Sequence, residues 1–204
     1  MKSVIVTITV CLGFDVWGQT QYQEQYNYED GFVVFSYGDT LRGRIKVRGG
    51  ISDVWRYEVV KFLKDGQITE FKPREVKYYR VGNDRFESKN LGGKGSKLIF
   101  FKIITKGYCT LYESKVKKGV SYNAFGQAGP SIIHGLYLQR EGEDLHPVNF
   151  SWLRQGRDLY FIDNIALTYD IRNRKYKADQ LADIVKRYNK EWKAARESES
   201  KSDN

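Results

Sequence analysis

The sequence predicts an α+β protein in which mainly antiparallel β-structure, forming a small barrel or sandwich, is followed by C-terminal α-helices. Short apolar or alternating segments separated by turn signals occupy residues 31–148, which is typical of antiparallel strands. After residue 148 the apolar residues recur at helical spacing. The chain of 204 residues holds 15 tyrosines and 11 phenylalanines but only 3 prolines, and this composition favours strands over flexible linker.

Residues 1–18 are organised like a secretory signal peptide. Lys2 gives a basic start, residues 4–14 form an apolar run too short for a permanent membrane span, and residues 16–18 (VWG) fit a cleavage site. We therefore expect a mature chain that begins at Gln19 and has no transmembrane segment. Its expected location is the periplasm, the cell surface or the medium.

Residues 19–30 are polar and aperiodic, which predicts a flexible arm before a β-rich domain of residues 31–148. Cleavage of the signal peptide removes Cys11 and leaves Cys109 as a single thiol, so we expect no internal disulfide. The fold must then be held together by its hydrophobic core.

The β-rich domain is predicted to consist of short strands joined by tight turns. Residues 38–39 (GD) and 64–66 (KDG) are turn signals, and the second is typical of a hairpin. Residues 41–47 alternate between apolar and charged side chains, as a strand with one buried face does. The expected strands cover residues 32–35, 41–47, 57–63, 67–71, 76–81, 85–88, 98–105, 108–113 and 131–140.

Residues 149–197 are predicted to be helical and to pack on the β-rich domain. A short helix is expected at residues 150–155 and a longer one at residues 158–172, with one apolar side formed by Leu159, Ile162, Ala166 and Tyr169. The clearest helix covers residues 178–196, whose apolar side should dock on the domain and consists of Leu181, Ile184, Val185, Tyr188 and Trp192. Residues 198–204 are polar and are expected to be a disordered tail.

The strand predicted at residues 41–47 and the cation that follows it carry the best functional signal. Strict alternation sends four cations, about 6–7 Å apart, to one face of the sheet. We predict a polyanion-binding row formed by Arg42, Arg44, Lys46 and Arg48. Trp55 and Tyr57 are candidate stacking groups beside it. Further cations can add to its field: Arg74, Lys77 and Arg80. The alternative is a solvated face whose cations protect an edge strand.

No catalytic or metal-binding motif stands out. His134 and His146 are the only histidines, and neither has a paired ligand spacing. His134 falls in an apolar strand, where we expect a packed side chain, and Cys109 should be a buried, inert thiol. The glycine-rich residues 92–97 lack the spacing of a phosphate-binding loop. We therefore expect no catalytic residue, no metal and no cofactor, while a hydrolase whose site forms only in three dimensions stays open as an alternative.

Several local patterns together resemble a family of exported, functionally uncharacterised proteins of Bacteroidota-type bacteria. The family's start, G-[YF]-[IV] and then G-D-T-[LI]-x-G-x-I, is matched by residues 31–33 and 38–45. Its Tyr/Phe-x-Pro element is similar to residues 71–73, its central hairpin to residues 100–112, and its helical, Tyr-Asn-containing ending to residues 171–189. The resemblance implies export and a β-rich body with terminal helices, and it carries over no catalytic residue.

These features predict an exported, non-catalytic cell-envelope protein that acts by binding or assembly. The formal net charge of +9 favours an anionic envelope polymer as the partner, and another envelope protein is the alternative. Because the chain is expected to leave the cytoplasm, no nucleic-acid partner is expected. The sequence gives no indication of the oligomeric state.

Overall fold

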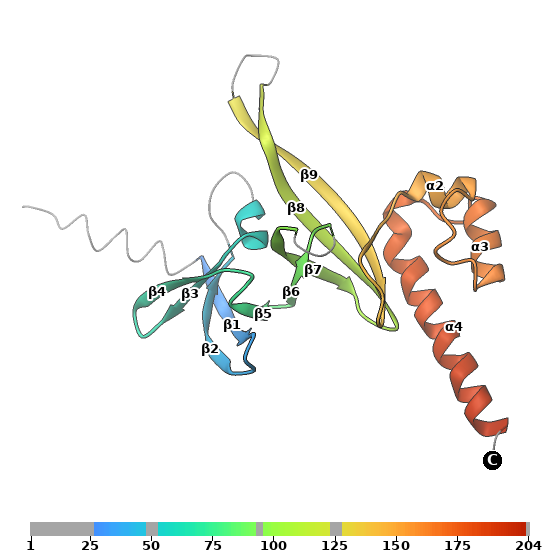
Figure 1. The fold of residues 1–204 in the computed structure, drawn as a ribbon, viewed down its shortest axis with the longest axis horizontal. Helices are drawn as coiled ribbons and strands as arrows, with labels where there is room; N and C mark the ends of the chain where they lie inside the picture. Colours follow the sequence, from blue (N-terminus) through green and yellow to red (C-terminus); the bar gives the residue numbers. More distant parts are fainter. Residues whose placement is uncertain (1–26, 48–52, 93–95, 123–127, 203–204) are drawn as a thin grey trace, which may run out of the picture.

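A computed structural model describes residues 27–47, 53–92, 96–122 and 128–202. Over these residues the chain forms one antiparallel sheet followed by C-terminal helices, which confirms the α+β prediction (Figure 1). The predicted signal peptide, most of the predicted arm, Arg48 and part of the glycine-rich segment lie outside the described residues.

The sheet is built largely from hairpins. Among the described pairings, only the one between β1 and β5 joins strands that do not follow each other in the chain. The strands are β1 (Tyr28–Phe35), β2 (Thr40–Lys46), β3 (Val60–Lys64), β4 (Gln67–Phe71), β5 (Val76–Val81), β6 (Asp84–Asn90), β7 (Leu98–Thr105), β8 (Cys109–Tyr122), β9 (Ala128–Arg140) and β10 (His146–Pro147). β1 therefore begins before Gly31, within the segment predicted as an arm.

The expected barrel or sandwich is replaced by a single open sheet. The strand order is β10-β9-β8-β7-β6-β5-β1-β2-β3-β4, so β10 and β4 are its edges. Closing a barrel requires hydrogen bonds between the two edge strands. These strands stand at opposite ends of the order, and the sheet is not closed into a barrel.

One core is formed by the N-terminal strands together with β6 and β7. The short 3₁₀ helix η1 (Asp53–Tyr57) places Tyr57 there, 1% exposed, against Phe86 at a ring-centroid distance of 5.6 Å. Phe86 also stacks on Tyr79 at 4.5 Å. The other buried members come from β1, β2, β3, β5 and β7: Val33, Ile45, Val60, Phe62, Val76, Val81 and Phe100.

A second core joins the helices to the sheet. The helices are α2 (Phe150–Gln155), α3 (Ile165–Arg172), the 3₁₀ turn η2 (Ala178–Gln180) and α4 (Leu181–Ser202). α4 packs on β7 and β8, and the predicted docking stripe is confirmed, since four of its members are at most 2% exposed: Leu181, Ile184, Val185 and Tyr188. Trp192 extends the contact by stacking on Tyr108 at 3.9 Å. The helix continues to Ser202, so the prediction of a disordered tail from residue 198 is wrong for residues 198–202.

The apolar side predicted for residues 158–172 is wrong. α3 begins only at Ile165, because the side chain of Asn164 caps it by accepting from the backbone N–H of Leu167 at 2.9 Å. The residues that pack inward are instead Phe161, Leu167 and Ile171. The predicted side, Leu159, Ile162, Ala166 and Tyr169, is exposed.

β8 and β9 are longer than predicted and pair with each other along their whole length. The described pairs of β8 with β7 end at Glu113, so the distal part of β8 and β9 is a two-stranded ribbon that projects from the sheet (Figure 1). His134 lies on this ribbon and is exposed, so its predicted packing is wrong. No helix among the described residues combines the length and the apolar composition needed to cross a bilayer.

Candidate anion-binding site

The alternation predicted for β2 is present in the structure. Ile45 is 1% exposed in the sheet core, and Leu41 packs against that core. Gly43 also faces inward, since a Cβ atom there would lie 2.5 Å from Cζ of Phe62. Because side chains alternate along a strand, Arg42 and Lys46 lie on the opposite, solvent-facing side of the sheet.

Pairing across β1 brings a further arginine to this face. Phe32 of β1 lies opposite Arg42 of β2 and opposite Arg80 of β5. Directly opposed residues share a face, so Phe32 lies between two arginines whose Cα atoms are about 10 Å apart, at two strand spacings. The Arg42 guanidinium carbon is 5.6 Å from the centroid of the Phe32 ring. Arg85 of β6 continues the row beyond Arg80.

Phe32, Arg42 and Arg80 line a hollow of about 580 Å³, which we call the arginine hollow. Its lining contains three arginines, one phenylalanine and one carboxylate, that of Asp30. The full lining is Asp30, Gly31, Phe32, Arg42, Gly43, Arg44, Arg80 and Gly82. The excess of positive charge over negative charge makes the hollow attractive to anions.

The arginines of the hollow differ in the hydrogen bonds and ion pairs that they form within the protein. Arg44 donates from Nη2 to the Tyr28 carbonyl at 2.8 Å, and Arg80 donates from Nε to the Gly82 carbonyl at 3.0 Å. Among the described residues, no carboxylate lies within ion-pair distance of Arg42 or Arg80, whereas other arginines, such as Arg56 with Asp84 at 3.0 Å, have acidic partners. Arg42 and Arg80 therefore have guanidinium groups available for a ligand.

The structure thus brings only part of the predicted polyanion-binding row to the arginine hollow. Arg42 and Arg44 line the hollow, while Lys46 lies outside its lining with Nζ 5.9 Å from the Tyr28 ring centroid. Arg48 lies outside the described residues. Arg80, which the sequence suggested only as an addition to the field, is a full member because β1 pairs with both β2 and β5.

The expected stacking groups of this row are wrong. Tyr57 does not lie beside it, because η1 packs on the inner face, where the Tyr57 hydroxyl donates to Glu113 at 2.6 Å. Trp55 belongs to the same 3₁₀ helix, so Phe32 takes the place of the expected stacking groups. In the strand order β2 lies between β1 and β3, and its described pairs with β3 are at Arg44 and Ile45, so edge protection does not explain Arg44.

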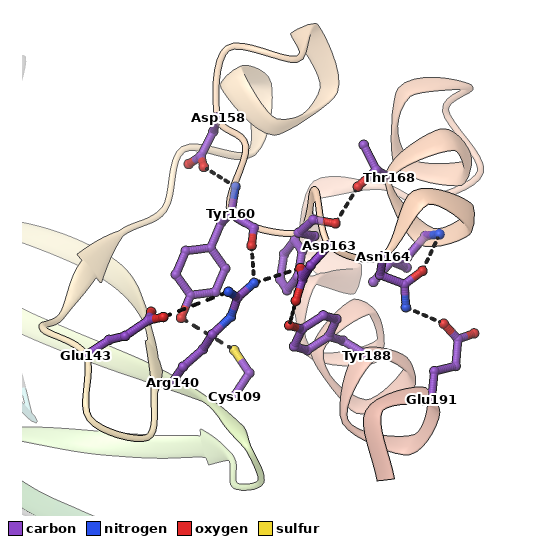
Figure 2. A network of polar contacts seen from close by, with 12 residues as sticks. Cys109, Arg140, Glu143, Asp158, Tyr160, Asp163, Asn164, Thr168, Tyr188 and Glu191 are labelled. Atoms are coloured by element: carbon purple, nitrogen blue, oxygen red, sulfur yellow. Dashed lines mark hydrogen bonds and ion pairs between the residues drawn. The ribbon is translucent and has the colours of Figure 1, made fainter. Parts of the chain in front are cut away.

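A separate polar network connects the sheet to the helices (Figure 2). Arg140 of β9 donates to the Tyr160 carbonyl and, at 2.8 Å, to Asp163, and its guanidinium carbon lies 4.7 Å from the centroid of the Tyr160 ring. Asp163 also accepts from the hydroxyl of Tyr188 on α4. Asp163 thus already has two protein partners, and this network fits a role in holding the helices to β9.

The thiol nearest this network is inert, and the nearest imidazole is held by a carboxylate. Burial raises the pKa of the Cys109 thiol to about 11, an effect that outweighs the hydrogen bond with Tyr160 that lowers it. A thiol with that pKa is almost entirely protonated at neutral pH, in agreement with the predicted inert cysteine. His146 is paired with Asp158 at 3.0 Å. Within the described part of the chain, no three His, Cys, Asp or Glu side chains are grouped so that they can hold a metal ion.

No protein-family model, no curated protein and no solved structure matches this chain. The resemblance to exported proteins therefore stays a prediction, as does export itself.

Proposed function

We propose that this protein is a non-catalytic binding protein of the cell envelope, which holds anionic groups of an envelope polymer in the arginine hollow. The observation that carries the proposal is that Arg42 and Arg80 flank Phe32 in a hollow with one carboxylate. The predicted signal peptide supports the location in the cell envelope, and the positive charge of the lining supports an anionic ligand.

The chemistry of the lining favours phosphate, sulfate or carboxylate groups. A guanidinium group presents its N–H donors in a planar fork that matches two oxygens of such an anion. Side chains that start about 10 Å apart can reach one anionic group from two sides or two successive groups of a polymer. The Phe32 ring between them offers an apolar surface to the part of the ligand that links the charges.

The test is the binding of fluorescent dextran sulfate, with uncharged dextran as the reference probe. Arg42→Gln and Arg80→Gln should each weaken binding about three- to tenfold, since each removes a charge-assisted contact. Both positions are solvent-facing, so the melting temperature should change little. Lys186→Gln and Lys190→Gln on α4 are the controls, because they remove the same charge far from the hollow along the chain and at exposed positions.

A gain of binding provides the complementary test. Asp30 is the carboxylate of the lining, so Asp30→Asn should strengthen dextran sulfate binding, and Asp65→Asn should not. Asp65 is a suitable control because it is exposed in the β3–β4 turn with φ 50°, a conformation that asparagine tolerates. For the wild-type protein, binding should weaken steeply as the salt concentration rises.

Equal losses in the arginine variants and in the α4 controls would show that the net charge of the whole chain, rather than the hollow, attracts the polymer. Binding that ignores salt, or that Asp30→Asn leaves unchanged, also contradicts the proposal.

A further inference from the structure

The outer face of α3 is apolar and has no covering element among the described residues. Ile165 is 82% exposed and Tyr169, one turn later, is 65% exposed. Arg172 follows at the next turn on the same face and is also exposed. The opposite face of the helix is the buried one, with Leu167 and Ile171 in the second core.

Other exposed apolar side chains precede α3 in the chain. Leu159 is 50% exposed and Ile162 is 55% exposed, although both belong to the short segment that leads into the helix. Trp152 of α2 is 53% exposed. Single exposed apolar residues are ordinary, whereas contiguous apolar patches mark interaction surfaces, and here five large exposed side chains lie within 18 residues of the chain.

A basic hollow adjoins this face. It has a volume of about 300 Å³ and is lined by Ser151, Arg154, Gln155, Arg172 and Arg174. Arg172 belongs both to this hollow and to the exposed face of α3, so the two are continuous. Its guanidinium lies against the backbone that ends α2, since a Cβ atom at Gly156 would be 2.9 Å from Nη2.

The charge of this second hollow is not compensated by the protein. Its lining contains three arginines and no carboxylate. The nearby Asp170 is held by Arg187 and Lys175, each at 2.6 Å. Asp158 is paired with His146 at 3.0 Å. Among the described residues, none of the three arginines of the hollow forms an ion pair.

From this arrangement we propose that the α2–α3 region docks on an anionic lipid surface. The exposed isoleucine, leucine, tyrosine and tryptophan side chains enter the interface, while the arginines of the second hollow bind lipid phosphates. A second copy of this chain is the poorer occupant, because apposing the same face of two copies would bring like-charged arginines together. A lipid leaflet supplies both the apolar layer and the negative charge that this surface lacks.

The proposal does not depend on the arginine hollow, which lies on β1, β2 and β5, whereas the α2–α3 surface belongs to the C-terminal helices. Either proposal can therefore fail alone. Arg42→Gln serves as the variant that separates them, since it should weaken dextran sulfate binding and leave lipid binding unchanged.

The experiment is co-sedimentation of the protein with vesicles of 30% phosphatidylglycerol and 70% phosphatidylcholine, compared with vesicles of phosphatidylcholine alone. The wild-type protein should partition preferentially onto the anionic vesicles, and the partition should weaken with salt. Ile165→Ser should reduce partition about tenfold, because a large apolar side chain is lost from the interface. Ile133→Ser is its matched control: Ile133 is also exposed, at 47%, but lies on the β9 ribbon.

Arg174→Gly separates a loss of binding from a loss of folding. Arg174 has φ 61°, a left-handed conformation that glycine adopts without strain, so this variant should keep or raise the melting temperature. It should nevertheless reduce partition about fivefold, as expected for one basic residue at an anionic surface. Lys186→Gln should have little effect.

Three results would overturn the proposal. They are equal partition onto neutral and anionic vesicles, an Ile133→Ser loss as large as that of Ile165→Ser, and complete release from vesicles by millimolar inorganic phosphate at constant ionic strength. The last of these results would identify a site for free phosphate. A fourth result also overturns the proposal: dimers that form without vesicle binding and that Ile165→Ser abolishes would identify a second copy of the chain as the occupant.

Discussion

Asn189 of α4 is expected to be one of the most sensitive polar positions in the protein. Its Nδ2 donates to the Cys109 carbonyl and its Oδ1 accepts from the Cys109 N–H, both at 2.8 Å. Cys109 is 0% exposed, so water cannot easily replace the amide. Asn189→Ala should therefore leave two buried backbone groups of β8 without partners.

The magnitude follows from those two groups. A buried polar group that loses its partner costs about 1–3 kcal/mol, so the variant should lose about 2–6 kcal/mol of unfolding free energy. For a chain of this size that corresponds to a melting temperature lower by about 4–24 °C. The loss is a large fraction of the about 5–15 kcal/mol that stabilises a typical folded protein.

Gly107 supplies an independent check on the same contact. A Cβ atom at Gly107 would lie 2.3 Å from Nδ2 of Asn189, so Gly107→Ala should displace the amide and break the same two hydrogen bonds. Once Asn189 is truncated, the added methyl group has room. The two substitutions should therefore be non-additive, with a coupling of about 1–3 kcal/mol.

The assay is urea unfolding of the wild-type protein, the two single variants and the double variant, followed by circular dichroism. Lys190→Ala, an exposed neighbour on α4, should stay within about 0.5 kcal/mol of the wild type. An Asn189→Ala variant as stable as the wild type, or strict additivity of the two substitutions, would refute the reasoning.

Two further predictions concern the core and the pH dependence of stability. Leu181 is 2% exposed in the second core, so Leu181→Ala should lower the unfolding free energy by about 2–5 kcal/mol in urea unfolding. A Leu181→Ala variant as stable as the wild type would show that α4 is dispensable. Burial alone would raise the pKa of Asp84, but hydrogen bonds and charges from Lys102 and Arg56 outweigh it and hold that pKa below its ordinary value. The unfolding free energy that Asp84 contributes should therefore be present above about pH 4 and be lost as the pH falls further. Asp84→Asn should be less stable than the wild type at pH 7, and this difference in unfolding free energy should shrink in acid. A difference that is constant from pH 7 to pH 3 contradicts the prediction.

Local periodicity explains what the sequence could predict. The alternation at residues 41–47 correctly separated Ile45 from Arg42, because a period of two assigns each side chain of a strand to one face. The helical spacing of Leu181, Ile184 and Tyr188 identified the docking side of α4, since that helix has one apolar side to bury. The same reasoning failed for residues 158–172, where the Asn164 cap delays the helix and the apolar side that the pattern indicated is exposed.

What the sequence alone determined is therefore which side chains share a face of each element, together with the basic character of the chain. Tertiary structure decided which faces are covered and which distant residues meet. Arg80 joins Arg42 around Phe32 only because β1 pairs with β2 on one side and with β5 on the other, and Asn189 reaches Cys109 only because α4 packs on β8. Periodicity is a property of neighbouring residues, whereas strand order and helix docking depend on the free energy of burying surfaces from the whole chain, which no local pattern contains.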